Sequence, residues 1–181
     1  MIKIVIFSGS ARKNNYTQHV ASFVAAVAGK NPELEVTVVS PTSLGLTFEN
    51  EGTEADYPEL RELVEGADGF IAVCPEYNHG FSGSLKYMLD LNLKEYIHKP
   101  IAFVGVSSGQ IGGARGVEAL VPIVREMGLI ATFTDVLVSN VNEEVVDGVF
   151  TDQPRWEKRV NRLLAELIWM ATTLQLGRSR E

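Results

Sequence analysis

Three short, almost uninterrupted apolar runs restrict the fold of this sequence more than any other feature. They occupy residues 2–7, 70–74 and 101–106. A strand with one face in water alternates apolar and polar residues, whereas a strand buried on both faces reads as a continuous apolar run. The three runs therefore predict the central strands of a parallel sheet that is covered by helices on both faces.

Two further segments have the composition of strands nearer the edges of a sheet. Residues 34–39 are rich in valine, and residues 129–138 mix β-branched with polar side chains. Apolar residues recur at helical spacing over residues 16–27, 60–64, 85–89, 117–127 and 156–168. This alternation predicts an α/β fold, a three-layer doubly wound α/β/α sandwich with a five-stranded parallel sheet in the order 2-1-3-4-5.

Length and composition limit the class of protein further. The chain has 181 residues, 45% of them hydrophobic, which fits one domain over residues 1–181. Its net charge of −7 argues against a broad nucleic-acid surface, and the apolar stretch 163–176 is too short for a membrane span of roughly 20 residues. Cys74 is the only cysteine, so an internal disulfide is excluded and a reducing, cytoplasmic location is expected.

The loop after the first predicted strand, residues 8–17, is rich in small and polar side chains. Ser10, Asn15 and Thr17 stand at the start of a predicted helix, where backbone amides and the helix dipole attract anions. Arg12 would add a fixed cation, so the loop predicts a phosphate site. The alternative is that these polar residues only cap the helix. Capping explains one such residue more easily than a cluster that includes an arginine.

Two further loops carry unusual sequences. Residues 75–83 combine an aromatic side chain with amide and glycine groups, which suits a flat heteroaromatic ring, although a turn followed by a helix cap at Ser82 or Ser84 explains them equally well. Residues 107–113 contain glycines that allow the backbone to approach a ligand closely. In the predicted strand order, the loops after strands one, three and four gather where the winding reverses, so we expect one common site.

The same residues resemble the NADPH-dependent FMN reductase family, which includes flavodoxin-like quinone, azo-dye and chromate reductases. The resemblance covers most of the chain. It rests on Gly9-Ser10-x-Arg12, on Pro75-Glu76-Tyr77-Asn78 with Gly83-x-Leu85-Lys86 and Asp90 beyond it, and on the glycines after Ser107. The sequence departs from the family pattern at Asn15, where serine is frequent, at Ser82, where proline is frequent, and at Leu91, where tryptophan is frequent.

The resemblance implies an NAD(P)H-dependent enzyme that passes hydride from NADPH or NADH through noncovalent FMN to quinones, azo compounds, metal oxyanions or free flavin. It implies a homodimer or homotetramer, with no metal and no catalytic side chain. Three groups of cofactor-binding residues follow from it: Ser10, Arg12, Asn15, Tyr16 and Thr17 for the phosphate; Pro75, Glu76, Tyr77 and Asn78 for the ribityl chain and ring; and Ser107, Ser108 and Gly109 for the pyrimidine edge.

Several alternatives stay open at this point. The chain could be a non-catalytic flavin-binding electron carrier or sensor, whereas a hydrolase is disfavoured because no serine stands in a Gly-x-Ser-x-Gly elbow. His79 fits either a solvated loop residue or a substrate contact, and Arg115 fits either a subunit interface or the phosphate of a nicotinamide nucleotide. We expect Cys74 to be a buried small hydrophobe and residues 178–181 to form a frayed tail.

Overall fold

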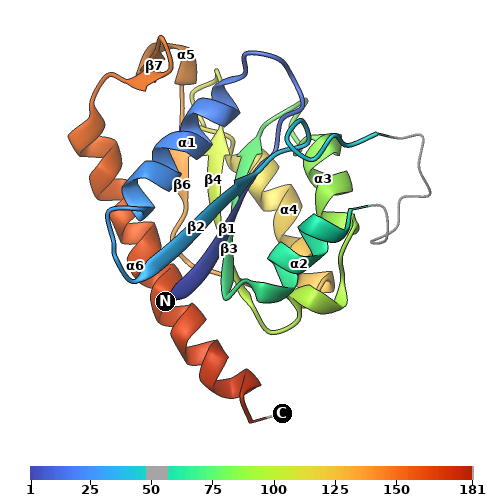
Figure 1. The fold of residues 1–181 in the computed structure, drawn as a ribbon. Helices are drawn as coiled ribbons and strands as arrows, with labels where there is room; N and C mark the ends of the chain where they lie inside the picture. Colours follow the sequence, from blue (N-terminus) through green and yellow to red (C-terminus); the bar gives the residue numbers. More distant parts are fainter. Residues whose placement is uncertain (48–56, 181) are drawn as a thin grey trace.

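The computed structural model describes residues 1–47 and 57–180, which form a twisted parallel sheet between two layers of helices (Figure 1). The strands run in the order β2-β1-β3-β4-β5, with β6 also paired to β4. Their bounds are β1 Ile2–Ser8, β2 Leu34–Val39, β3 Gly69–Pro75, β4 Pro100–Val106, β5 Ile130–Ala131 and β6 Val136–Val138. All pairs within this sheet are parallel, so the predicted fold class and strand order are confirmed.

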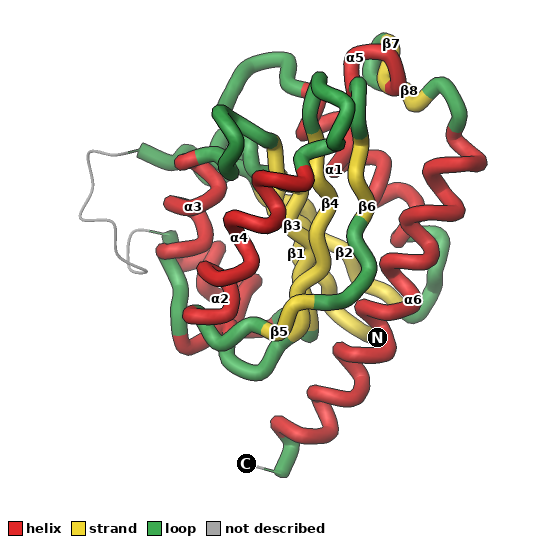
Figure 2. The backbone as a smooth tube through the Cα atoms, turned by 180° about the vertical axis from the view of Figure 1, so that it is seen from behind, coloured by secondary structure: helices red, strands yellow, loops and turns green. Residues whose placement is uncertain are grey.

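Side chains from each central strand enter two separate cores. Ile4 and Ile6 of β1 pack in the core beneath α1 (Tyr16–Ala28) and α6 (Gln153–Arg178), whereas Val5 and Phe7 pack in the opposite core. The opposite core is covered by three helices, α2 (Pro58–Gly66), α3 (Gly83–Asp90) and α4 (Ala114–Glu126), which Figure 2 shows on the other side of the sheet. Burial of both faces explains why β1, β3 and β4 read as continuous apolar runs.

One predicted strand is two strands in the structure. Residues 129–138 were expected to form a single edge strand, but β5 and β6 are separated by residues 132–135. The amide of Phe133 donates to Oε1 of Glu166 at 2.5 Å, so the chain turns toward α6 and leaves the β4 ladder there. The expectation of one continuous strand was therefore wrong, although both pieces lie parallel to β4.

A short excursion between β6 and α6 has no counterpart among the sequence predictions. It contains α5 (Val141–Glu144) and a two-stranded hairpin of β7 (Val145–Val146) and β8 (Val149–Phe150). The hairpin turns through Asp147 and Gly148, whose φ angles of 49° and 80° are both positive. The indole nitrogen of Trp156 donates to Oε2 of Glu144 at 2.9 Å and joins the excursion to α6.

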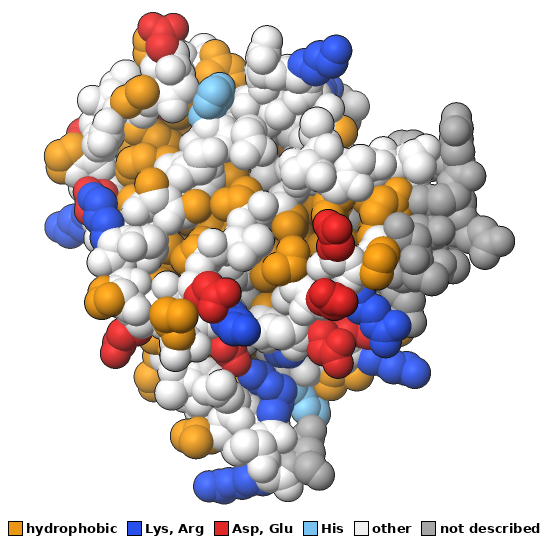
Figure 3. All heavy atoms as spheres, in the orientation of Figure 1, with side chains coloured by type: hydrophobic (Ala, Val, Ile, Leu, Met, Phe, Trp, Pro, Cys, Tyr) orange, Lys and Arg blue, Asp and Glu red, His pale blue; other side chains and the backbone are white. Residues whose placement is uncertain are grey.

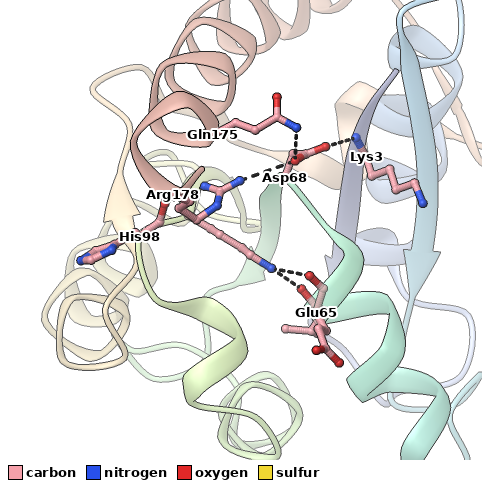
Figure 4. A network of polar contacts seen from close by, with 8 residues as sticks. Lys3, Glu65, Asp68, His98, Gln175 and Arg178 are labelled. Carbon is pink, nitrogen blue, oxygen red and sulfur yellow. Dashed lines mark hydrogen bonds and ion pairs between the residues drawn. The ribbon is translucent and has the colours of Figure 1, made fainter. Parts of the chain in front are cut away.

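A network of polar groups closes the amino-terminal end of the sheet (Figure 4). The carboxylate of Asp68 accepts hydrogen bonds from the Lys3 amide at 3.0 Å, from Gln175 at 3.2 Å and from Arg178 at 3.5 Å. Arg178 also donates to the carbonyl of His98 at 2.8 Å. The prediction that the frayed tail begins at Arg178 was wrong, because α6 continues to this residue, whose side chain is bound to two other segments.

Lys99 completes this end of the molecule. Its ammonium group donates to the carbonyls of Val64 at 2.8 Å and Glu65 at 2.7 Å, in the last turn of α2, where backbone carbonyls lack helical partners. Burial, and then the nearby Arg178, lower the pKa of Lys99 to about 8.

Among the residues described, no helix is long and apolar enough to cross a membrane.

Candidate active site

The three special loops meet at the carboxyl end of the sheet, around a cleft of about 270 Å³. The cleft lies where the segments after β1, β3 and β4 converge, with one contribution from the start of α5. Its lining residues are Arg12, Lys13, Asn14, Asn15, Tyr16, Thr17, Pro75, Glu76, Tyr77, Val106, Ser107, Ser108 and Val141. The expectation that residues from three distant segments border one crevice is thus met.

The first wall of the cleft is the β1–α1 loop. Asn15 is the N-cap of α1, since its Oδ1 accepts from the Gln18 amide at 2.8 Å while its Nδ2 donates to the carbonyl of Arg12 at 2.6 Å. The capping alternative is therefore correct for the Asn15 side chain. Amides in the first turn of a helix have no intrahelical acceptor. Those of Tyr16 and Thr17 have no acceptor within the described residues and lie at the cleft.

Tyr77 connects the first wall to the second. The Arg12 guanidinium lies 4.1 Å from the centroid of the Tyr77 ring, a cation–π contact, and the hydroxyls of Ser10 and Tyr77 are hydrogen-bonded at 2.8 Å. Ser10 is buried and is absent from the cleft lining, so the structure places it behind Tyr77. Its hydroxyl thus contacts the phenol rather than the open cleft.

The segment after Tyr77 is a tight two-residue turn. Tyr77 and Gly80 exchange backbone hydrogen bonds of 2.8 and 3.0 Å, and the φ angles of Asn78 and His79 are 50° and 67°. These angles match a type I′ turn, which needs positive φ at both central residues. Asn78 and His79 are exposed and do not line the cleft, so the structure does not bring the predicted Asn78 into it.

Serine hydroxyls fix this second loop against the first. Ser82 is the N-cap of α3, and its hydroxyl also donates to the carbonyl of Gly9. The Ser84 hydroxyl donates to the same carbonyl at 3.0 Å. The serine that replaces the family's frequent proline at position 82 therefore supplies a direct link between two loops of the site.

Glu76 carries the one buried carboxylate of the cleft lining. Its side chain is 9% exposed, and Oε1 lies 3.6 Å from Nη1 of Arg115 at the start of α4. The other oxygen, Oε2, is buried and has no hydrogen-bond partner among the described residues. Arg115 thus forms an ion pair with a site residue, while half of the carboxylate remains free to accept a hydrogen bond.

The third wall, residues 107–109, is fixed mainly by backbone contacts. The amides of Asn140 and Val141 donate to the carbonyls of Gly109 and Ser107 at 3.0 and 3.1 Å. The Ser107 hydroxyl is already engaged, because it accepts from the Gly113 amide at 3.1 Å and donates to the Gly109 carbonyl at 3.2 Å. Gly109 is exposed and does not line the cleft, although Ser107 and Ser108 do.

Gly113 allows this wall to pack closely against the sheet. Its φ is 83°, and a Cβ built on it would lie 2.4 Å from the backbone nitrogen of Val106. The glycine is thus required for contact between α4 and β4, rather than for approach to a ligand. Four lining residues were not predicted from the sequence: Lys13, Asn14, Val106 and Val141.

Cys74 lies beneath the cleft and outside its lining. The thiol is fully buried, and burial, with the charge of Glu76 as a second cause, raises its pKa to about 12. The thiol is therefore protonated at neutral pH, in agreement with the interpretation of Cys74 as a small buried hydrophobe.

Comparison with known proteins places these features in a family. Residues 2–143 match the family described as NADPH-dependent FMN reductase. The NADPH azoreductase of Bacillus sp. (strain OY1-2) is 33% identical over 123 residues, which are 66% of this chain and 66% of that protein, just under two thirds of its length. The 2-hydroxy-1,4-benzoquinone reductase of Burkholderia sp is 30% identical over 138 residues, 68% of this chain and 73% of the relative.

A solved structure supports the same fold. FerB from Paracoccus denitrificans, a flavoenzyme NAD(P)H:(acceptor) oxidoreductase, superposes with a TM-score of 0.75 over 95% of this chain and 98% of its own, at 23% identity. Likeness at this level of identity shows the fold alone. The family match, in contrast, spans all three loops that line the cleft. The chain therefore belongs to the NADPH-dependent FMN reductase family.

Proposed function

We propose that this protein is an NAD(P)H-dependent FMN oxidoreductase that passes reducing equivalents from NADPH or NADH to small acceptors such as quinones and azo compounds. The observation that carries the proposal is the convergence of the loops after β1, β3 and β4 on one cleft. When bound, FMN supplies the hydride chemistry, so the protein has to bind, orient and shield it.

The β1–α1 wall fits the phosphate of FMN. The amides of Tyr16 and Thr17 supply donors at the positive end of α1, and the Arg12 guanidinium supplies a cation beside them. Asn15 acts by capping the helix and so orienting those amides. Ser10 acts through Tyr77, because its hydroxyl is bonded to the phenol.

The other two walls fit the remainder of the cofactor. Pro75 and Tyr77 offer apolar and aromatic surface, and the free Oε2 of Glu76 offers a buried acceptor. An unsatisfied buried acceptor costs about 1–3 kcal/mol, so a ligand donor at this point would be stabilising. The ribityl hydroxyls and the ring N–H of FMN are donors of this kind. Ser107 and Ser108 border the same cleft, whereas Asn78 and Gly109 flank it.

The names of the relatives support the class of acceptor. One relative is named an azoreductase and another a benzoquinone reductase. Azo compounds and benzoquinones are both small molecules. We place the donor and the acceptor in the same cleft, one after the other. Parallel double-reciprocal plots are the kinetic pattern expected for such alternation, and intersecting plots would contradict it.

We further propose that the whole chain acts as one domain, that it forms a homodimer or homotetramer, and that it works in the cytoplasm. Large exposed apolar side chains support the association, since such groups are common at protein interfaces. Phe133 is 87% exposed and Trp169 of α6 is 67% exposed. Light scattering of the purified protein, expected to give two or four times the mass of the 19.8 kDa chain, tests this.

The visible spectrum of purified protein tests the main proposal. We expect a yellow protein with flavin absorbance that bleaches when NADPH or NADH is added without oxygen and returns when a quinone follows. Flavin absorbance that persists with both nucleotides would instead indicate an electron carrier. Colourless protein that does not bind added FMN would refute the flavin site itself.

A further inference from the structure

A second cleft lies on the other side of the β1–α1 loop. It has a volume of about 430 Å³ and separates this loop from the turn that follows β2. Residues 12–15 line both clefts and thus form the wall between them. The lining residues of the second cleft are Ser10, Arg12, Lys13, Asn14, Asn15, Gln18, His19, Ser40, Thr42 and Ser43.

The charged side chains among the described residues that line this second cleft are all basic. Arg12 and Lys13 are exposed, and neither has a carboxylate partner within the described ranges, although the whole chain carries a net charge of −7. Some other surface cations of the protein are paired, for example Lys30 with Glu157 at 2.6 Å. Unpaired cations in a polar hollow concentrate positive potential and attract anions.

The opposite wall is rigid and offers a hydroxyl. Ser40 and Ser43 bind each other's backbone amides through their side chains at 2.9 and 3.0 Å, which fixes the turn. The Thr42 hydroxyl, between them, is exposed and has no hydrogen-bond partner in the part of the chain that the structure describes. Thr42 lines the same cleft as Arg12 and Lys13, and a hydroxyl donor combined with cations suits a phosphate group.

The position of the second cleft determines which phosphate group of a nicotinamide dinucleotide can reach it. Tyr77 and Ser107 border the first cleft only, so a nicotinamide beside them could reach the second cleft only with its distal end. The phosphate of a nicotinamide dinucleotide that lies farthest from the nicotinamide is the 2′-phosphate of NADPH, which NADH lacks. In Rossmann domains a carboxylate binds the free 2′-hydroxyl of NADH, and no carboxylate belongs to the described lining of this cleft.

We propose that the cleft between the β1–α1 loop and the Ser40–Ser43 turn binds the 2′-phosphate of NADPH, with Lys13 as its cation and Thr42 as its hydroxyl donor. This assignment rests on the proposed function and deepens it, because it makes the protein prefer NADPH to NADH. Arg12, on the wall shared with the first cleft, keeps its role at the FMN phosphate.

Steady-state kinetics of Lys13→Gln with both nucleotides test this proposal. Loss of one charge-assisted contact to a phosphate corresponds to a rise of about tenfold in the KM for NADPH relative to the KM for NADH. Thr42→Val should raise the KM for NADPH by about threefold. Lys30→Gln, in the turn after α1, is the matched control and should change neither KM.

A binding measurement provides a second readout that does not depend on turnover. In calorimetry with the FMN-loaded protein, 2′,5′-ADP should bind about tenfold more tightly than 5′-AMP, and Lys13→Gln should abolish the difference. An equal rise in both KM values, or equal binding of the two adenosine nucleotides by the unsubstituted protein, would overturn the 2′-phosphate assignment. Failure of the unsubstituted protein to oxidise either nucleotide would contradict the proposed function instead.

Discussion

Charged side chains at the two ends of the sheet differ in whether they bind other groups of the protein. At the amino end, Asp68, Lys99 and Arg178 all bind groups of the protein itself (Figure 4). At the carboxyl end, Arg12 and Lys13 have no acidic partner within the described ranges, and the space-filling view in Figure 3 shows Lys or Arg side chains projecting at the edge of the molecule where Figure 1 has the β1–α1 loop.

This contrast separates groups that stabilise the fold from groups that are available to a ligand. Polar groups that are fully paired within the protein contribute to stability, whereas unpaired ones reduce stability or remain solvated until a ligand arrives. Substitutions at the amino end should therefore change stability alone, and those at the carboxyl end should change ligand binding. Four measurements test this division, beginning with the largest expected effect.

Gly113→Ala is a deliberate exception to the division, because it lies at the carboxyl end and should still destabilise the fold. The added Cβ would meet the Val106 nitrogen at 2.4 Å, and φ of 83° is unfavourable for alanine. We expect the free energy of unfolding to fall by about 2–4 kcal/mol in urea denaturation. Gly66→Ala, at the end of α2 with open space around it, is the control and should be neutral or slightly stabilising. Equal stability of the two variants would contradict the packing argument.

Arg12→Ala should weaken binding of FMN without loss of stability in the apoprotein. Removal of one cation from a phosphate site corresponds to a 10- to 100-fold rise in Kd, or about 1.4–2.7 kcal/mol. Quenching of flavin fluorescence during titration measures the Kd. Arg162→Ala, an exposed arginine of α6, should leave it unchanged. An unaltered Kd in Arg12→Ala would remove Arg12 from the phosphate site.

Asp68→Ala should have the converse effect, with stability lowered and FMN affinity retained. The substitution removes the acceptor of the Lys3 amide, Gln175 and Arg178, for an expected cost of about 1–3 kcal/mol. Chemical denaturation and the FMN titration are measured on the same sample. Glu157→Ala, which breaks an exposed pair, should cost less than about 1 kcal/mol. A weaker FMN site in Asp68→Ala would show that the two ends of the sheet are coupled.

The last measurement concerns the pH dependence of stability. Because the pKa of Lys99 is lowered from 10.5 to about 8 in the folded protein, the unfolded chain holds more protons between these pH values. Stability contributed by this group therefore rises as the pH increases from about 8 to 10.5. Arg178, Asp68, Glu65 and Glu95 are the charged groups around it. Lys99→Met should lack this rise in urea denaturation from pH 7 to 10, and identical pH profiles for the two proteins would contradict the explanation.

The parts of the fold that could be predicted from the sequence are those in which burial produces a regular pattern of apolar residues. The runs at β1, β3 and β4 were predictable because both faces of each strand are buried, and residue type alone reveals this. The break between β5 and β6 was not predictable, because it depends on a contact between Phe133 and Glu166, distant in sequence. The hairpin of β7 and β8 is too short to show periodicity.

In the candidate site, too, features that leave a local sequence pattern were predictable and features that depend on local backbone geometry or distant contacts were not. Clustered glycine, hydroxyl and amide residues identified all three loops of the cleft. Asn78 was expected in the cleft from its place in the Pro75-Glu76-Tyr77-Asn78 motif, but the positive φ of the type I′ turn directs residues 78 and 79 to the surface. Val141 enters the cleft from a segment without any sequence signal, through a backbone bond to Ser107.

The sealed position of Cys74 makes this chain convenient for site-specific labelling. Thiol reagents attack the thiolate, and burial suppresses both access and ionisation at the only cysteine of the sequence. A cysteine introduced at an exposed position such as Arg162 on α6 would then be the single reactive thiol in the folded protein. Fluorophores or spin probes could be attached there without first removing the native sulfur.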